Sequence, residues 1–272
     1  MKIYANIAVV LLAFAALIFS GCGEQKTSNT TPAANEPSAN TTVNLPEGVA
    51  PENVNLTTDD DVIINANYYK PAEPATAAVM LIHQRYSNKE AWNPIIGKIV
   101  AKGYAVIAFD MRGHGKSTKT TGGETIGEPA EGQWWECKKD AQAALNFLLG
   151  KGIKRVAVAG TSVGASIAVY CASENDAVKG IIMLSPVITI DPAVVQAASS
   201  LGSRRVFMYC SKNDERGGNP DSARAFADRM TDTPHQMHAF DGSDHGMAML
   251  GKKYGDFDVN ENILKELDSI LK

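Results

Sequence analysis

The sequence predicts an α/β fold: a mostly parallel sheet of about eight strands with helices on both faces and no large cap domain. From about Val54 onward, short apolar runs alternate with stretches of helical length, which is typical of repeated strand–helix units. The apolar runs are continuous, as expected of parallel strands buried on both faces. Between Pro186 and Arg204 there is room for one short helix and no inserted cap.

The expected elements follow in chain order. Residues 53–58 and 62–69 alternate polar and apolar side chains around the turn 59–61, so they predict two opening strands. Glycines at 103 and 150 mark the ends of two helices. The remaining expectations are strands at 77–82, 104–110, 155–160, 180–185, 204–211 and 235–240, and helices at 89–102, 135–150, 163–173, 222–230 and 257–272.

The first 22 residues combine a positive charge, an apolar run and a cysteine. Lys2 supplies a positive charge, and the apolar run 5–19 is shorter than the roughly 20 residues of a membrane span. It ends in Phe-Ser-Gly-Cys (19–22), which resembles the lipobox of prokaryotic lipoproteins, in which the cysteine is lipidated. We expect a signal peptide over 1–21, lipidation of Cys22, and an exported protein anchored in the cell-envelope membrane, facing outside the cytoplasm. A plain secretory signal or an uncleaved anchor is the alternative.

Residues 22–51 are rich in Ser, Thr, Asn, Ala and Pro and almost free of large apolar side chains. Such a segment cannot bury enough surface to offset its ordering entropy, so a flexible linker is expected before a folded domain at 52–272. The formal net charge of -4 gives no sign of a basic nucleic-acid surface. We therefore expect no nucleic-acid partner, whereas the predicted lipid anchor makes a membrane an expected partner.

The remaining cysteines, Cys137, Cys171 and Cys210, lie in apolar contexts. Buried free thiols are favoured, and one disulfide plus one free thiol remains open. The Cys and His spacings do not match a metal site, so we expect neither a metal nor an organic cofactor.

The stretch VAVAGTSVGAS at 156–166 carries the strongest functional signal. A β-branched strand enters Gly160-Thr161-Ser162-Val163-Gly164, and a helical pattern leaves it. Strand, Gly-x-Ser-x-Gly and helix are the setting of a nucleophile elbow, in which a strained serine stands at the carboxyl end of the sheet. An ordinary tight turn between a strand and a helix is the competing interpretation.

A base and an acid are also available in the required chain order. His235, His238 and His245 follow Ser162, and the first two lie inside an expected strand. His245 lies in a loop after the last strand, and Asp214 lies in the loop after residues 204–211. Because the carboxyl ends of parallel strands meet at one edge, Ser162, Asp214 and His245 are the predicted catalytic residues. Turn and capping roles for Asp214 and His245 are the alternatives.

From about Val54 to the C-terminus the chain resembles the α/β-hydrolase superfamily, closest to its dienelactone-hydrolase-like and small serine esterase branches. FDMRGHGKS (109–117) is similar to a structural turn of that superfamily, which makes His114 structural. LIHQRYSNKEAW (81–92) is similar to its oxyanion loop, with Gln84 where glycine is commonest. The resemblance implies that His83 orients this loop. Dienelactone hydrolases use cysteine in the elbow, whereas this chain has Ser162 there, so the resemblance does not imply that specific activity.

These residues predict a serine hydrolase that acts on a carboxylic ester or related acyl substrate through an acyl-enzyme intermediate. The backbone amides of Gln84 and Val163 are the expected oxyanion hole. A catalytically inactive hydrolase fold that serves as an envelope binding protein is one alternative. A thioesterase or peptidase with the same triad is the other.

Overall fold

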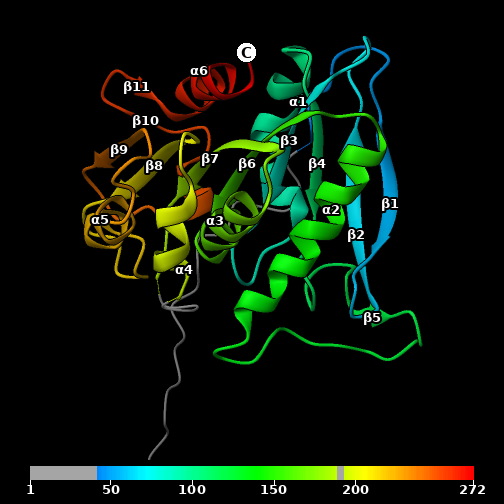
Figure 1. The fold of residues 1–272 in the computed structure, drawn as a ribbon. Coiled ribbons are helices and arrows are strands. Elements are labelled where there is room, and N and C mark those ends of the chain that lie inside the picture. The colour runs from blue at the N-terminus through cyan, green and yellow to red at the C-terminus, as the bar shows by residue number, and fades with distance from the viewer. Residues whose placement is uncertain (1–41, 189–192) are drawn as a thin grey trace, which may run out of the picture. The chain divides into compact units, whose positions relative to one another are not determined.

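A computed structural model describes residues 42–188 and 193–272, and in this part of the chain nine strands form the central sheet. Their order is β1-β2-β4-β3-β6-β7-β8-β9, with β5 paired to β2 (Figure 1). Neighbours from β4 to β9 run parallel, whereas β2 is antiparallel to both β1 and β4. The predicted mostly parallel sheet is confirmed. The strands are β1 (Pro51–Thr57), β2 (Val62–Tyr69), β3 (Ala77–Ile82), β4 (Ala105–Phe109), β5 (Lys119–Thr120), β6 (Arg155–Thr161), β7 (Val178–Leu184), β8 (Arg205–Ser211) and β9 (His235–Phe240).

Helices cover both faces of the sheet, as expected. Alternate residues of β3 show this, because Met80 and Ile82 pack into one hydrophobic cluster and Val79 and Leu81 into the other. The first cluster also takes apolar residues from α2, α3, α4 and α5, and the second takes them from α1 and α6. The helices are α1 (Asn93–Ala101), α2 (Lys138–Gly150), α3 (Val163–Glu174), α4 (Ala193–Ala197), α5 (Pro220–Ala227) and α6 (Val259–Leu271).

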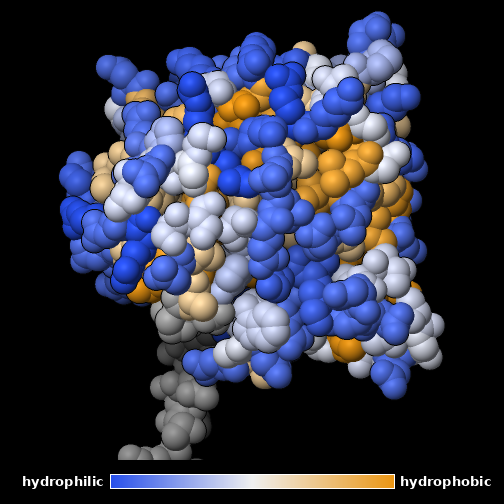
Figure 2. Space-filling view, viewed as in Figure 1, coloured by the Kyte–Doolittle hydropathy of each residue, from blue (hydrophilic) through white to orange (hydrophobic). Residues whose placement is uncertain are grey.

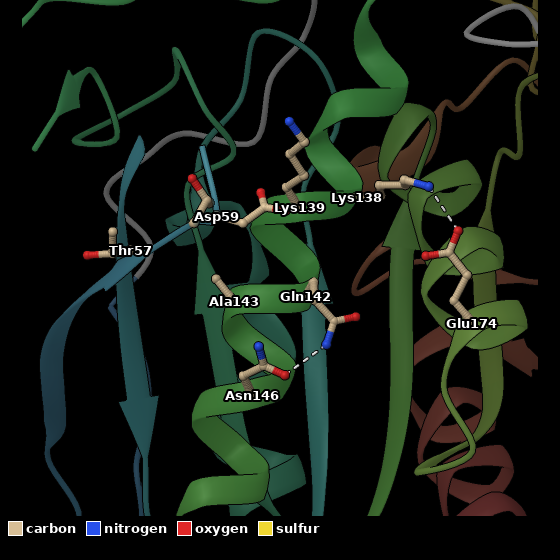
Figure 3. Close-up of a pocket in the computed structure, with 9 residues that line it drawn as sticks. Thr57, Asp59, Lys138, Lys139, Gln142, Ala143, Asn146 and Glu174 are labelled. Carbon is tan, nitrogen blue, oxygen red and sulfur yellow. Dashed lines mark hydrogen bonds and ion pairs between the residues drawn. The ribbon is translucent and has the colours of Figure 1, made fainter. Parts of the chain in front are cut away.

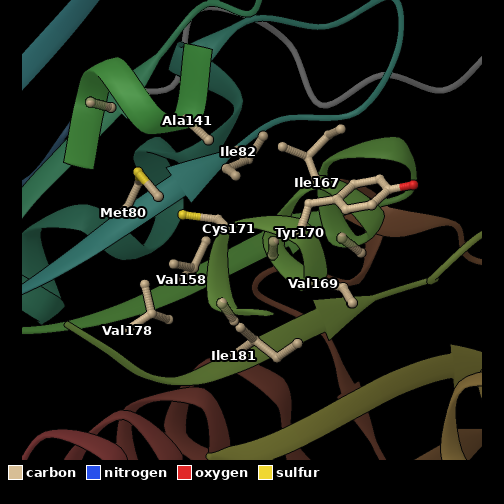
Figure 4. Close-up of a cluster of buried hydrophobic side chains, with 14 of the residues drawn as sticks. Met80, Ile82, Ala141, Val158, Ile167, Val169, Tyr170, Cys171, Val178 and Ile181 are labelled. Carbon is tan, nitrogen blue, oxygen red and sulfur yellow. The ribbon is translucent and has the colours of Figure 1, made fainter. Parts of the chain in front are cut away.

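The helix α3 lies deepest of these. All residues from 163 to 172 are buried, so the helix is enclosed rather than amphipathic. Figure 4 shows its Ile167 and Cys171 gathered with Met80 and Val158, which come from β3 and β6. Each fully buried aliphatic side chain contributes about 1.5–3 kcal/mol. This packing fixes the N-terminal end of α3 firmly at the end of β6.

Several elements differ in detail from the expectation. The helices expected at 89–102 and 135–150 each begin as a 3-10 turn, η1 (Lys89–Trp92) and η2 (Trp134–Cys137). The helix expected at 222–230 begins at Pro220, because Asn219 Oδ1 accepts hydrogen bonds from the amides of Asp221 and Ser222 and Pro220 suits the first helical position. Three two-residue strands were not expected, since two residues show no periodicity: β5, β10 (Lys253–Tyr254) and β11 (Phe257–Asp258).

The described chain starts within the expected linker. Val43, Leu45 and Val49 pack against the cluster formed with α1 and α6, and a Cβ on Gly97 would lie 1.8 Å from the carbonyl oxygen of Asn44. The segment therefore passes directly over α1 before β1 begins. The signal peptide (1–21), the lipidated Cys22 and the linker up to residue 41 lie outside the described residues and stay predictions.

The described surface is largely hydrophilic on the face drawn in Figure 2, with hydrophobic side chains gathered over the upper end of α2. Two further 3-10 turns are η3 (Ala198–Ser200), which follows α4, and η4 (Gly246–Met249), which follows β9. Within residues 42–188 and 193–272, no helix combines the length and the apolar character needed to cross a bilayer.

Candidate active site

Ser162 occupies the turn between β6 and α3 in a strained conformation. Its φ is 53° and its ψ is -119°, values that L-residues rarely adopt. The Ser162 amide donates a 2.9 Å hydrogen bond to the carbonyl of Leu184 at the end of β7. Although Ser162 precedes the helix, its hydroxyl caps none of the amides of α3 that the structure describes. The turn thus uses a serine for something other than helix capping, the usual role of serine there.

Glycine is required at positions 160 and 164, on either side of Ser162, because a larger side chain would not fit there. A Cβ on Gly160 would lie 2.2 Å from the carbonyl oxygen of Gly164, and a Cβ on Gly164 would lie 2.5 Å from those of Ile82 and His83. The first contact closes the turn, and the second brings the start of α3 against the end of β3. The Gly-x-Ser-x-Gly spacing therefore reflects two close backbone approaches.

The predicted acid and base are hydrogen-bonded to each other. His245 Nδ1 lies 2.7 Å from Asp214 Oδ2, and both side chains are buried. Asp214 follows β8, and its Oδ1 accepts a 3.0 Å hydrogen bond from the amide of Arg216. Since a carboxylate only accepts, His245 Nδ1 carries the proton in this pair, and Nε2 is left as the basic nitrogen.

The loop after β9 carries His245 and is called the histidine loop (residues 241–249). It lies against the serine turn, which is the turn between β6 and α3 (residues 160–164). Gly246 has a φ of 52°, and a Cβ there would lie 3.4 Å from the Cβ of Thr161 and 2.2 Å from Gln84 Oε1. Gly246, the neighbour of His245, therefore lies close to Thr161, the neighbour of Ser162. The structure brings all three predicted catalytic residues to the carboxyl edge of the parallel strands.

The segments that carry the two predicted oxyanion donors approach each other closely. Val163 is the first residue of α3, where amides have no acceptor within the helix. Gln84 follows the end of β3 and is buried. The contact of Gly164 with the carbonyl of His83 joins their two segments. A developing negative charge between these segments would meet the N-terminal end of a helix.

His83 holds the turn after β3. Its Nδ1 donates to the carbonyl of Gln84 at 2.7 Å, and its Nε2 accepts from the amide of Met111 at 2.9 Å. This pairing fixes a neutral tautomer, and burial lowers the pKa of His83 to about 4. His83 therefore orients the loop and is not placed to act as the base.

The residues of FDMRGHGKS form a buried polar network. Asp110 accepts from the amide and the ammonium of Lys89 at 2.9 and 2.7 Å, and Ser117 Oγ donates to the carbonyl of Asp110. Arg112 binds Asp140 and Asp60. His114 is buried between the rings of His83 and Trp134, with centroids 5.2 and 5.6 Å away. The structural role expected of His114 agrees with these contacts.

His235 and His238 lie on β9, as expected, and their side chains bind groups other than the predicted catalytic residues. His235 Nδ1 donates to the carbonyl of Thr233 at 2.9 Å, and His238 Nε2 lies 3.0 Å from Glu266 Oε1 on α6.

Cys137, Cys171 and Cys210 are buried free thiols among the described residues. Burial raises the pKa of the Cys171 thiol to about 12 and that of Cys210 to about 11, so neither is a reactive nucleophile.

Two contacts at this edge were missed by sequence reasoning. Ser185 Oγ accepts from the amide of Gly246, and Gln84 Oε1 accepts from the amide of Met247, both at 2.9 Å. Besides Asp61, the non-glycine residues with positive φ among the described residues are Tyr86, Ser162 and Ser185, which follow β3, β6 and β7. One sequence feature could have pointed to Ser185: it forms a Ser-Pro pair directly after a buried strand, at the same edge of the sheet as Ser162.

A separate hollow of about 330 Å³ lies between the β1–β2 turn and the outer side of α2 (Figure 3). Its lining is polar, and the predicted catalytic residues are not part of it. Lys138 and Glu174 form a 2.9 Å ion pair across one side. Other residues that line it are Thr57, Asp59, Gln142 and Asn146.

Comparison with known proteins finds a matching family and a curated relative. The family described as serine aminopeptidase, S33, matches residues 73–208, which is half of the chain and includes Ser162. A bifunctional esterase/perhydrolase of Acinetobacter calcoaceticus is 29% identical over 147 residues, or 53% of this chain and 48% of that protein. The chain thus spans about half the length of this curated relative.

Solved structures share the fold at low identity. An esterase of Pyrococcus furiosus is 18% identical with a TM-score of 0.68, covering 82% of this chain and 94% of its own. An acetyl xylan esterase of Paenibacillus sp. R4 is 17% identical with a TM-score of 0.64, covering 83% and 85%. An acylaminoacyl peptidase of Pyrococcus horikoshii is 15% identical with a TM-score of 0.63, covering 82% and 42%.

Proposed function

Since the chain belongs to the serine aminopeptidase S33 family, with the α/β-hydrolase fold, we propose that it is a serine hydrolase that cleaves carboxylic esters by acyl transfer. The observation that carries this proposal is the strained Ser162 at the same edge of the sheet as a buried His245–Asp214 hydrogen bond of 2.7 Å. Backbone strain of this kind concentrates at functional sites.

In the proposed mechanism, Ser162 Oγ attacks the carbonyl carbon of the ester while His245 Nε2 takes the hydroxyl proton. Asp214 keeps the proton of His245 on Nδ1 and stabilises the imidazolium. The amides of Val163 and Gln84 donate to the tetrahedral oxyanion; losing one such donor typically costs about 3 kcal/mol of barrier. His245 then protonates the leaving alcohol, and water releases the acyl group by the reverse sequence.

A fluorophosphonate probe tests this assignment, because it reacts with an activated serine. The wild-type protein should take up one probe per chain, and Ser162→Ala should abolish uptake and lower ester hydrolysis about a million-fold. Ser173→Ala removes a hydroxyl at the far end of α3, where it donates to the carbonyl of Tyr170, and should label like wild type. Undiminished labelling of Ser162→Ala would reject the assignment, and a wild-type protein that never labels would favour the binding-protein alternative.

The second candidate is peptide or amide cleavage by the same triad. The family description names aminopeptidases, whereas the Acinetobacter relative and several structural neighbours are named as esterases. p-Nitrophenyl esters of increasing acyl length, the matching thioesters and aminoacyl p-nitroanilides separate these classes. We expect the highest kcat/KM for a short acyl ester, and a higher value for an anilide would make the protein a peptidase.

A further inference from the structure

The η4 turn of the histidine loop begins without a side-chain cap of its own. His245 has an extended backbone and precedes η4, so it stands where a residue with a capping side chain is usual. Its side chain caps no amide of this turn among the described residues, because its Nδ1 proton goes to Asp214. The first amides of such a turn still need acceptors, since the turn itself supplies none.

Those acceptors come from two other segments. The amide of Gly246 donates to Ser185 Oγ, and the amide of Met247 donates to Gln84 Oε1, each at 2.9 Å. Ser185 is fully buried, and Gln84 is 5% exposed. A buried amide without an acceptor costs free energy, so both hydrogen bonds favour this position of the loop. They therefore hold the backbone directly after His245 against Ser185 and Gln84.

Ser185 connects this loop to the serine turn. It is the residue after Leu184, whose carbonyl accepts from the Ser162 amide at 2.9 Å. The positive φ of 49° at Ser185 is strained for a serine, and its own amide donates to the carbonyl of Tyr209. Two adjacent residues at the end of β7 thus hold the backbone of the proposed nucleophile and the backbone beside the proposed base.

Gln84 makes the matching connection from the other side. Its backbone amide is the proposed oxyanion donor, while its side-chain carbonyl holds Met247. A glycine at position 84 would leave the backbone donor in place and remove the side-chain contact. Gln84 therefore sets the spacing between the oxyanion donor and the histidine loop.

We propose that Ser185 and Gln84 are positioning residues, which cap the η4 turn in place of His245 and hold its imidazole against Ser162. This inference rests on the triad proposed above. Small errors in the placement of a catalytic group cost large factors in rate, because effective molarity depends on alignment. Loss of either acceptor should therefore lower kcat more than it changes KM.

The test compares two variants that each remove a hydrogen-bond acceptor of the histidine loop with a control variant that removes a buried acceptor in another part of the protein. Ser185→Ala and Gln84→Met remove the two acceptors with little change in volume. Ser117→Ala is the matched control: buried Ser117 Oγ accepts from the amide of Asn65 at 2.8 Å, away from the histidine loop. We expect kcat for a p-nitrophenyl ester to fall about 10- to 100-fold in the first two, with KM within about twofold, and less than about threefold in the control.

Two readouts keep the result independent of folding losses. The downfield proton resonance of the His245–Asp214 hydrogen bond should weaken or move in Ser185→Ala and Gln84→Met and stay unchanged in Ser117→Ala. Urea denaturation of each variant is the second readout: a fall in kcat in a variant that is fully folded under the assay conditions comes from positioning and not from unfolding.

The inference is overturned if Ser185→Ala and Gln84→Met match Ser117→Ala in kcat and in the proton resonance. Failure of the serine-hydrolase proposal would look different, because the wild-type protein itself would then resist the fluorophosphonate probe.

Discussion

Individual backbone contacts decide the geometry around Ser162. Adding a methyl group at Gly160 or Gly164 forces it to within 2.2–2.5 Å of backbone oxygens, which have no side-chain freedom to move away. We expect Gly160→Ala and Gly164→Ala each to lower the free energy of unfolding by about 3 kcal/mol or more, measured by urea denaturation.

Gly150 provides the control for these two substitutions. It ends α2, its φ is not positive, and a Cβ there would meet nothing within 4 Å. Gly150→Ala should leave stability unchanged or raise it by about 0.5–1 kcal/mol. Equal stabilities for Gly160→Ala and Gly150→Ala would contradict the steric account of the elbow.

The buried His83 should make stability depend on pH. Burial lowers its pKa from 6.5 to about 4, so between these values the unfolded chain binds a proton that the folded protein does not. Stability is therefore present above pH 6.5 and is lost as the pH falls toward 4, by about 3 kcal/mol from this group. Burial raises the pKa of Asp140 to about 6, which acts with the opposite sign over part of the same range.

His83→Gln isolates the contribution of His83. Glutamine can donate to the Gln84 carbonyl and accept from the Met111 amide, as His83 does, but it does not titrate. Asp140 is present in both proteins and cancels in the comparison. Unfolding free energies measured from pH 4 to 7 should fall less steeply on acidification in the variant; parallel curves would show that His83 is not protonated on unfolding.

The three proposed catalytic residues could be predicted from the sequence because their positions depend only on strand order. Ser162 and Asp214 each follow a buried strand, and His245 follows β9, the last strand of the sheet. Parallel strands bring such positions to one edge. Ser185 and the side chain of Gln84 could not be predicted in this way. Their contacts depend on the path of the loop after β9, which has no periodic pattern.

Neighbouring elements are joined by Arg112, which lies in the loop after β4. It donates to Asp140 on α2 and to Asp60 in the turn between β1 and β2. The side chain of Arg112 is 6% exposed, and that of Asp140 is 0% exposed. Burial alone would raise the pKa of Asp60, but hydrogen bonds from Arg112, Thr58 and Lys139 outweigh it and hold that pKa well below its usual range.

Arg112→Met should destabilise the fold by about 3–5 kcal/mol, because it leaves the Asp140 carboxylate buried without its partner. Arg112→Met combined with Asp140→Leu should recover much of this loss, since both charges are then gone. Urea denaturation of the two single variants and the double variant completes the cycle. If the double variant loses the sum of the single losses, the two residues do not act as a pair.

Most helices and strands were predictable because apolar periodicity and glycine or capping signals agreed. β3 and β9 occupy the expected residues, and the 3-10 turns before α1 and α2 changed only the type of the first helical turn. The shortest elements, β5 and the β10–β11 hairpin, were not predictable. Their pairing partners are set by the folded chain rather than by a local pattern.

The folded domain has one hydrophobic cluster on each face of a single sheet, so it needs no second domain to bury its apolar residues. The sheet could be predicted as a whole because continuous apolar strands require cover on both faces. What lies before residue 42 rests on sequence alone. There the chain offers an apolar run at 5–19 that ends at Cys22, followed by the polar linker.

If Cys22 is lipidated, membrane attachment should depend on that single thiol. A buried acyl chain contributes about 0.8 kcal/mol per CH₂, so one chain binds reversibly and several hold a protein stably. We expect the wild-type protein to incorporate a labelled fatty acid and to stay with membranes through high-salt and alkaline washes. Cys22→Ala should abolish the label and leave residues 1–21 attached, or release the protein in soluble form. Cys137→Ala and Cys171→Ala should keep the label, since those thiols are buried; persistent labelling of Cys22→Ala would mean that the lipid, if any, is attached elsewhere.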